Sequence, residues 1–251
     1  MIEININVPF KTYFYDCVDS TNNVCKELAK NGEASALVIA YSQTAGKGRL
    51  GRSFFSPEGT GIYMSLLLRP AFSPEQITLI TTAAAVAVAN SIEKVCNKNP
   101  RIKWVNDIYI DKKKVCGILC EAGFSGGGNS SNYVILGIGI NLFSPKNSFP
   151  EDIKNKAGSI FESATEDNRL KEALIEEIVN SFIEIYNTLP SKAYMKDYRA
   201  KSFIIGKTVS FNKDGQFFKG TVQDINDNAE IIIQAKDKTV TLFAGEVSLE
   251  I

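Results

Sequence analysis

Histidine is absent from the 251-residue sequence. Without an imidazole, the protein cannot use a Ser-His-Asp triad, a Cys-His pair or a metal site that includes histidine. Any catalysis must therefore rely on lysine, arginine, carboxylate, amide and backbone groups.

An excess of basic charge is also missing, because 28 Lys and Arg balance 28 Asp and Glu. Proteins that hold nucleic acid usually carry net positive charge, since neutralisation of phosphates dominates that affinity. We therefore expect no nucleic acid partner, although a local basic site remains open. The 44% hydrophobic and 22% charged residues are typical of an ordinary globular protein.

Features of exported and membrane proteins are scarce as well. The five cysteines form no Cys-x-x-Cys motif, which predicts reduced thiols in the core and a cytoplasmic protein. Residues 1–5 alternate apolar and polar side chains, unlike a signal peptide. The longest apolar helical stretch, residues 79–89, is expected to be too short and too rich in Thr and Ala to span a bilayer, so we expect no membrane partner.

The apolar periodicity predicts a mixed α/β fold, in which a β-sheet is flanked by helices. Ser20 or Thr21 is expected to cap a first helix that ends before Gly32, and Pro74 to stand at the first position of a helix over 73–95. A long amphipathic helix over 170–189 and a shorter one to about 201 follow. The predicted strands are 2–8, 36–40, 62–68, 101–104, 108–110, 114–121 and 132–141, the last two separated by a Gly/Ser/Asn-rich turn at 125–132.

The pattern changes at Gly206, where short strands replace helices. The predicted strands are 209–211, 217–225, 231–234, 240–243 and 247–251, with turns at 214–215, 227–228 and 237–238. Short strands at this spacing favour a small β-barrel. We therefore predict a catalytic domain over 1–203 and a second, all-β domain over 204–251.

The loop Gly46-Lys47-Gly48-Arg49-Leu50-Gly51 matches the spacing of a dinucleotide-binding turn. That motif is specific only when a helix follows it, because the helix N-terminus holds the pyrophosphate. Here a turn and another strand follow, which excludes this interpretation. Three cations stand among the glycines (Lys47, Arg49 and Arg52), a composition suited either to closing over a phosphate or carboxylate or to an ordinary solvated loop.

Five motifs on either side of this loop, taken in order together with it, resemble the biotin protein ligase family. The resemblance covers residues 13–145 and lies in the loop together with Asp19-Ser20-Thr21-Asn22, Gln43-Thr44-Ala45, Lys103-Trp104-Val105-Asn106-Asp107, Lys114-Val115-Cys116-Gly117-Ile118-Leu119-Cys120-Glu121 and Gly137-Ile138-Gly139-Ile140-Asn141. It implies the catalytic fold shared with class II aminoacyl-tRNA synthetases and a C-terminal SH3-like β-barrel. The N-terminal DNA-binding domain of the regulatory members is not expected, nor is a repressor function.

The resemblance also implies a two-step reaction. The carboxylate of biotin attacks ATP, in the presence of Mg²⁺, to give biotinyl-5'-AMP and pyrophosphate. A lysine of a biotin carboxyl carrier protein domain of a carboxylase then takes up the biotin. Both steps bring negative groups together, so fixed cations and dipoles serve them better than a histidine base.

Site residues are carried over from the family's motifs. Those expected to bind biotin are Ser20, Thr21, Asn22, Gln43, Lys47, Gly48, Arg49, Lys114 and Gly117. Those expected to bind ATP are Lys47, Arg49, Arg52, Phe54, Lys103, Asn106, Asp107 and Asn141, with Asp107 also a candidate Mg²⁺ ligand. Lys114 and Arg49 are the candidate catalytic residues.

Taken alone, several of these residues have ordinary explanations. Ser20 to Asn22 would serve as a helix cap, Gln43 as an exposed side chain, and Lys114 as one of three solvated lysines in a turn. The sequence also departs from the family's usual residues, with Lys47 in place of arginine, Leu50 in place of a basic residue, Phe54 in place of tryptophan and Val105 in place of proline.

Two other functions compete with biotin ligation. A lipoate or octanoate ligase or transferase is similar in fold. Its pocket needs a narrow apolar channel for the acid and not polar partners for a ureido ring. A module that binds RNA or protein and has lost its activity is the other alternative. An edge strand and an exposed loop could both support a homodimer, which is therefore a further possible partner.

Overall fold

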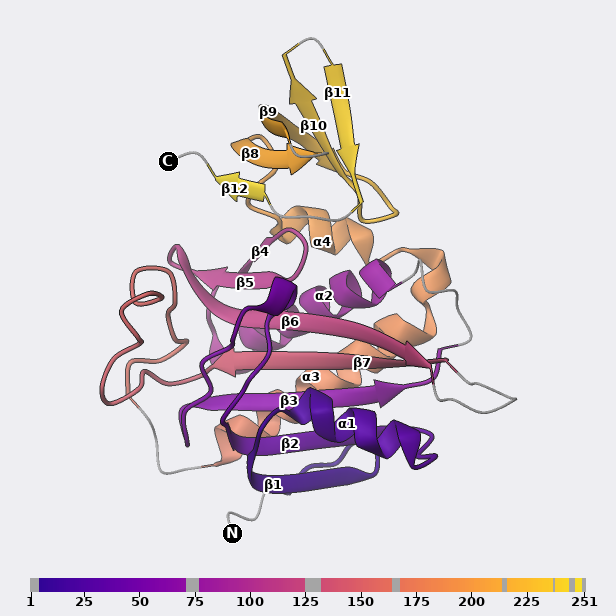
Figure 1. Cartoon of the computed structure of the whole chain (residues 1–251), viewed down its shortest axis with the longest axis vertical. Coiled ribbons are helices and arrows are strands. Elements are labelled where there is room, and N and C mark those ends of the chain that lie inside the picture. The colour runs from indigo at the N-terminus through magenta and orange to yellow at the C-terminus, as the bar shows by residue number, and fades with distance from the viewer. Residues whose placement is uncertain are drawn as a thin grey trace.

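A seven-stranded mixed sheet forms the centre of the computed structural model (Figure 1). The structure describes residues 5–70, 77–124, 132–163, 168–213, 216–236, 238–243 and 247–249. The strand order is β1-β2-β3-β7-β6-β5-β4. β1 and β2 are parallel, and the other neighbours are antiparallel. The strands are β1 (Thr12–Val18), β2 (Ala36–Gln43), β3 (Gly61–Leu68), β4 (Arg101–Lys103), β5 (Asp107–Ile110), β6 (Lys113–Phe124) and β7 (Asn132–Asn141). The mixed α/β prediction is confirmed.

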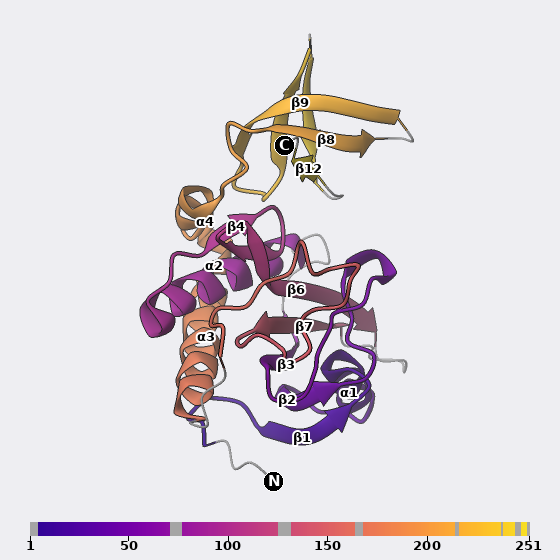
Figure 2. The same cartoon turned by 90° about the vertical axis from the view of Figure 1, so that its left-hand side faces the viewer.

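Helices cover both faces of this sheet, which explains why its central strands read as continuous apolar runs. Leu37 and Ile39 of β2 pack into the main core, and Ala36 and Val38 into a smaller cluster on the opposite face. Helix α1 (Thr21–Lys30) lies on the second face, while α2 (Ile77–Cys96) and α3 (Arg169–Asn187) lie on the first (Figure 2).

The predicted helices are present. Helix α1 begins after Ser20 and is followed by Gly32, whose φ of 87° suits glycine. Helix α3 buries Leu174, Ile178 and Phe182 of its predicted apolar face, and the short helix η3 (Leu189–Ser191) and α4 (Met195–Lys201) follow it. The predicted helix start at 73–74 and the turn at 125–132, except for Asn132, lie outside the described residues.

The N-terminal strand prediction is wrong over residues 5–8, which belong to no sheet; residues 1–4 lie outside the described ranges. The backbone of this segment forms hydrogen bonds with side chains of a helix and not with a neighbouring strand. The backbone nitrogens of Asn5 and Asn7 donate to the carboxylates of Glu172 (2.9 Å) and Glu176 (2.5 Å) on α3. Alternating apolar residues therefore mark an extended segment packed on a helix, and the true edge strand is β1, which the sequence did not reveal.

Helix α2 is longer than the apolar stretch predicted from sequence. Its segment from Thr78 to Cys96 is long and apolar enough to cross a membrane by length and composition alone. However, 78% of the most apolar 18-residue stretch of this segment is buried inside the protein. The expectation that this stretch is too short is therefore wrong. Packing between the sheet and α3 accounts for its apolar character.

The predicted core thiols are mostly confirmed. Cys25, Cys96 and Cys116 are buried and Cys120 is half-buried, whereas Cys17 is exposed. All five are free. Burial raises the pKa of Cys25 to about 12, so this thiol stays protonated at neutral pH.

The C-terminal residues form a second, antiparallel sheet of five strands in the order β11-β10-β9-β8-β12. They are β8 (Thr208–Lys213), β9 (Gln216–Ile225), β10 (Ile231–Ala235), β11 (Lys238–Leu242) and β12 (Val247–Leu249). Over the residues that the structure describes, the two end strands β11 and β12 do not pair with each other. The sheet is therefore open, and the predicted closed barrel is not confirmed. Of the predicted turns, 214–215 and residue 237 lie outside the described ranges.

A buried hydrogen bond joins the second sheet to the first. The indole nitrogen of Trp104, which follows β4, donates to the carbonyl of Ala229 between β9 and β10 at 2.8 Å. Both residues are buried. Nearby, Arg199 of α4 forms an ion pair with Asp227 at 2.7 Å. The residues after Trp104 are site candidates, so this junction fixes one side of the site.

The junction gives a stability prediction. Replacement Trp104→Phe leaves the buried Ala229 carbonyl without its donor, and we expect the free energy of unfolding to fall by about 1–3 kcal/mol. The measurement is urea unfolding followed by circular dichroism. The matched control is Asp227→Asn, which removes a more exposed ion pair at the same junction and should cost less than about 1 kcal/mol. Equal losses in the two variants would contradict the role given to the indole.

Candidate active site

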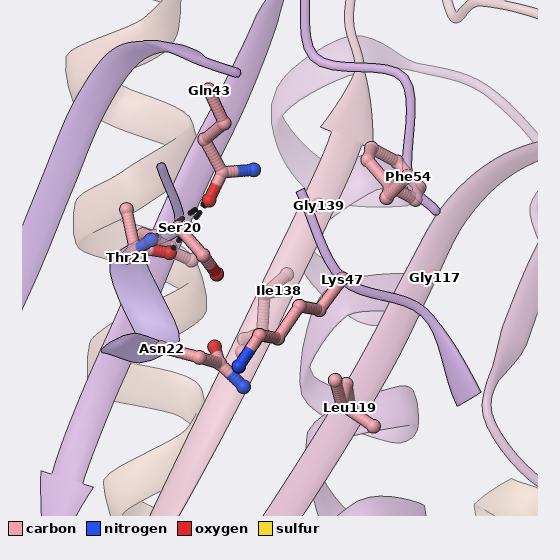
Figure 3. Close-up of a pocket in the computed structure, with 12 residues that line it drawn as sticks. Ser20, Thr21, Asn22, Gln43, Lys47, Phe54, Gly117, Leu119, Ile138 and Gly139 are labelled. Atoms are coloured by element: carbon pink, nitrogen blue, oxygen red, sulfur yellow. Dashed lines mark hydrogen bonds between the residues drawn. The ribbon is translucent and has the colours of Figure 1, made fainter. Parts of the chain in front are cut away.

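A pocket opens over the middle of the large sheet, between the start of α1 and the glycine-rich loop (Figure 3). Its empty volume is about 290 Å³, part of it open to solvent. The lining residues are Ser20, Thr21, Asn22, Gln43, Lys47, Phe54, Met64, Gly117, Leu119, Gly137, Ile138 and Gly139. Six of the nine residues predicted to bind biotin thus line one pocket.

One wall of the pocket is polar and built by the first turn of α1. The backbone nitrogen and the hydroxyl of Thr21 both donate to Gln43 Oε1, at 2.9 and 3.2 Å. Gln43 Nε2 in turn donates to Ser56 Oγ at 2.8 Å. Ser20 is buried and makes no side-chain capping bond, so the simple capping interpretation does not describe it. The wall presents hydroxyl and amide groups of fixed orientation.

Ser65 extends this hydrogen-bond network beneath α1, although it belongs to none of the motifs in the sequence. Its hydroxyl lies 2.7 Å from Thr21 Oγ1 and 2.6 Å from Asn22 Oδ1. The signal was a single polar residue within the apolar strand β3. Glu121 was also missed: Asn22 Nδ2 donates to its carboxylate at 2.7 Å. A charged residue at the end of the apolar run in β6 was the available sign.

The floor of the pocket depends on glycines of β6 and β7. Gly117 and Gly139 are direct partners in the sheet, and the ring of Phe54 lies on them. A Cβ atom at Gly139 would be 2.6 Å from the Phe54 ring, and one at Gly137 would be 2.2 Å from Asn22 Oδ1. These glycines are required because neighbouring side chains occupy the space where their own would be.

The glycine-rich loop is held at both ends and exposed at its tip. Phe54 N donates to the Gly46 carbonyl at 2.8 Å, and Gly48 N to the Arg52 carbonyl at 2.7 Å. Lys47 Nζ donates to the side-chain oxygen of Asn23 on α1, and Figure 3 shows Lys47 extending toward Asn22. Arg49 begins the short helix η1 (Arg49–Gly51) at the tip.

At this tip Leu50 is 73% exposed, with a φ of 54°. Arg52, which follows η1, is also exposed. Of the loop cations, Lys47 alone lines the pocket. The structure therefore divides the loop into a part that closes the pocket and a tip that faces solvent.

A second polar cluster lies beside the pocket, where β5 and β6 begin. Arg49 donates to Asn106 Oδ1 at 3.0 Å, and Asn106 Nδ2 donates to the Ile118 carbonyl at 2.9 Å. Lys114 Nζ and Asp107 Oδ1 form an ion pair at 2.7 Å. The cluster therefore combines two cations, an amide and a carboxylate, all of them predicted site residues.

The remaining candidates flank this cluster. Lys103 ends β4 and is the sheet partner of Asp107, so both side chains emerge on one face. Asn141 ends β7 and donates to the Gly158 carbonyl at 2.9 Å, while Gly158 N donates to the Lys114 carbonyl at 2.9 Å. The segment after β7 thus ties Asn141 to the strand that carries Lys114.

Gly117 connects the pocket with the second cluster. A Cβ atom at Gly117 would lie 3.3 Å from both Lys114 Nζ and the Phe54 ring. The lysine ammonium is therefore at the rim of the pocket, and the Lys114 side chain is 32% exposed to solvent. A polar ligand end held by α1 and an anionic end held beside Lys114 would fit this arrangement, and cations so placed stabilise charge that develops in a reaction.

The cluster does not form a metal site of its own. No group of three or more Cys, Asp or Glu residues suited to a metal ion occurs within the described ranges. Asp107 supplies one carboxylate, and its partner is the Lys114 ammonium. Mg²⁺ at such a place is ordinarily held by substrate phosphates and water together with one or two carboxylates.

Comparisons with known proteins agree on one family. The model of the biotin/lipoate A/B protein ligase family matches residues 14–141. The bifunctional ligase/repressor BirA of Bacillus subtilis is 32% identical over 244 residues, which cover 94% of this chain and 73% of the relative. The biotin--[acetyl-CoA-carboxylase] ligase of Mycobacterium tuberculosis is 29% identical, covering 92% of this chain and 87% of that one.

A solved structure matches the fold over almost the whole chain. The biotin protein ligase of Aquifex aeolicus in complex with biotin and ATP superimposes with a TM-score of 0.78, at 25% identity, and the match covers 96% of this chain and 98% of the other. The similarity thus includes the C-terminal residues beyond the family match.

The glycine floor gives a prediction about the loop. Replacement Gly139→Ala forces the Phe54 ring away, and overpacking of this kind costs about 1–3 kcal/mol. Because Phe54 anchors the loop, we expect tryptic cleavage after Lys47, Arg49 or Arg52 to become about tenfold faster. The assay is limited proteolysis read by mass spectrometry.

The control is Gly123→Ala, at the other end of the same strand pair. A Cβ atom there would lie 2.4 Å from the Tyr133 ring, far from the loop. This variant should lose stability without faster cleavage of the loop. Loop cleavage at the wild-type rate in a folded Gly139→Ala protein would contradict the anchoring role of Phe54.

Proposed function

Because the chain belongs to the biotin/lipoate A/B protein ligase family, a family of ligases, we propose that it is an ATP-dependent biotin protein ligase. Its substrates are then biotin, ATP and a lysine of a biotin carboxyl carrier protein domain. The relatives carry the names of biotin ligases, and a solved relative holds biotin and ATP. We also propose that the described residues act in biotin ligation and not as a DNA-binding repressor.

The proposed reaction has two steps. A carboxylate oxygen of biotin forms a bond with the α-phosphorus of ATP, and the bond to pyrophosphate breaks. The lysine amine of the carrier then bonds to the carbonyl carbon of biotinyl-5'-AMP, AMP leaves with the electron pair of its oxygen, and the amine loses a proton. Both steps gather negative charge at one place, where cations lower the barrier.

One observation carries the proposal: a pocket with a polar wall ends at a lysine. The ureido ring of biotin has two N–H donors and a carbonyl acceptor, which need partners when buried. Ser20, Thr21 and Asn22 supply such groups. At the other end, Lys114 Nζ lies beside Gly117 at the rim, where it would meet the biotin carboxylate and the α-phosphate.

The second cluster would receive the nucleotide. Arg49 would leave Asn106, to which it donates in this structure, and neutralise the phosphates together with Lys114. The freed Oδ1 of Asn106, with the second hydrogen of its Nδ2, suits an adenine edge, since one amide pairs with both N6 and N7. Mg²⁺ would be held by the phosphates, with Asp107 as a candidate additional ligand once Lys114 turns to the substrate.

Residues 1–203 would act as the catalytic domain and 204–251 as a second domain. For the second domain we propose an SH3-like fold of five strands, although β11 and β12 do not pair with each other over the described residues. Its bond to Trp104, next to Val105 and Asn106, supports a role in steadying the nucleotide side of the site. Arg52, Phe54, Lys103 and Asn141 complete the proposed ATP contacts.

The choice of biotin over lipoate gives a direct test. Purified protein with ATP and Mg²⁺ should release pyrophosphate when biotin is added, and lipoate should give less than about one hundredth of that rate, because its ring cannot satisfy the polar wall. A coupled pyrophosphate assay measures both rates, and mass spectrometry then follows transfer to a carrier domain. Release with lipoate but not biotin would overturn the proposal, and binding of biotin and ATP without any adenylate would support a module that has lost its activity.

Lys114 gives a second prediction. Replacement Lys114→Ala should lower the rate of pyrophosphate release by about 100- to 1000-fold, the cost of losing one electrostatic stabiliser, while the Kd for biotin changes much less. The matched control is Lys112→Ala, two residues away and exposed, which should keep its activity. Near-normal pyrophosphate release by Lys114→Ala would remove Lys114 from the catalytic role.

A further inference from the structure

Glu121 lies next to the pocket without lining it. Its two carboxylate oxygens accept hydrogen bonds from residues one turn apart on α1: Asn22 Nδ2 at 2.7 Å and Lys26 Nζ at 2.7 Å. On the opposite side of the same amide, Ser65 Oγ donates to Asn22 Oδ1 at 2.6 Å. The Asn22 amide, a pocket wall residue, is therefore held at both ends.

The negative charge of Glu121 fixes which end of the Asn22 amide faces it. Burial alone would raise the pKa of the Glu121 carboxyl, but the hydrogen bonds from Lys26 and Asn22 and the charges of Lys26 and Lys47 outweigh burial and lower it. At neutral pH Glu121 is therefore a carboxylate, which only accepts hydrogen bonds. The nitrogen of the Asn22 amide must face it, and the amide oxygen must face Ser65.

The ion pair with Lys26 does not by itself explain the carboxylate. Its two side chains are 31% and 25% exposed, and pairs near the surface contribute little to stability. The bond to Asn22 is different because Asn22 is buried and its orientation decides which group the pocket wall presents to a ligand.

We propose that Glu121 is a positioning residue for the biotin-binding pocket, acting by fixing the orientation of the Asn22 amide. The inference rests on the proposed function and deepens it, since it concerns recognition of biotin and not the chemistry at Lys114. One hydrogen of the Asn22 Nδ2 group is committed to Glu121, and the other remains for a ligand acceptor.

The test replaces the carboxylate by its neutral isostere. In Glu121→Gln the new amide can donate, so it no longer dictates which way the Asn22 amide turns. We expect the KM for biotin to rise about tenfold, while the KM for ATP and kcat change less than about twofold. Lys26→Met, which removes the other partner of the same carboxylate, should change the KM for biotin less than about threefold.

A double-mutant cycle separates positioning from a general structural effect. If Glu121 acts through Asn22, then Glu121→Gln should have almost no further effect on the KM for biotin in an Asn22→Ala protein. An unchanged KM for biotin in Glu121→Gln, or a tenfold rise that persists in the Asn22→Ala background, would overturn the inference.

Two further results keep the test decisive. If Glu121→Gln does not fold, Ser65→Ala removes the opposite partner of the same amide and should raise the KM for biotin alone; a folded Ser65→Ala protein with wild-type KM contradicts the inference. Wild-type protein that neither binds nor activates biotin would overturn the proposed function and this inference together. Wild-type activity with an unaffected variant overturns this inference only.

Discussion

The site depends on the absence of side chains at the centre of the sheet. Gly117 and Gly139 face each other across β6 and β7, and the Phe54 ring occupies the space above them. Without this gap the glycine-rich loop would have no anchor on the sheet, and Lys114 would be separated from the pocket by a side chain. A close approach of one aromatic ring to two strands therefore sets the position of both the loop and the rim lysine.

The polar wall depends on side chains that hold its groups in place, and two of them, Ser65 and Glu121, do not line the pocket. Thr21 and Asn22 are oriented by Gln43, Ser65 and Glu121. Such groups would be costly if left unpaired in a buried place, and the network satisfies them before any ligand arrives. A pocket of this kind gains selectivity because its donors and acceptors are fixed in advance.

Much of this was predictable from sequence, and the reasons for the rest are physical. Periodicity identified β2, β3, β6, β7 and the helices, because burial on both faces or on one face leaves a regular pattern. It failed at residues 5–8, where the backbone pairs with glutamates of α3, contacts that no local pattern encodes. The family's motifs identified most of the pocket residues. Ser65 and Glu121 stand out in the sequence only as polar residues in apolar strands, because the partners that give them a role are distant in sequence and come near only in the folded chain.

The contact between Trp104 and Ala229 has a practical consequence. The chain contains one tryptophan, and it is buried at the junction of the two sheets, one residue before Val105 and two before the proposed adenine contact Asn106. Its emission therefore originates from a single, known place. Movement of the C-terminal sheet or of the nucleotide side of the site would alter the surroundings of that one indole, so the protein carries an intrinsic optical probe of its own interior and needs no attached dye.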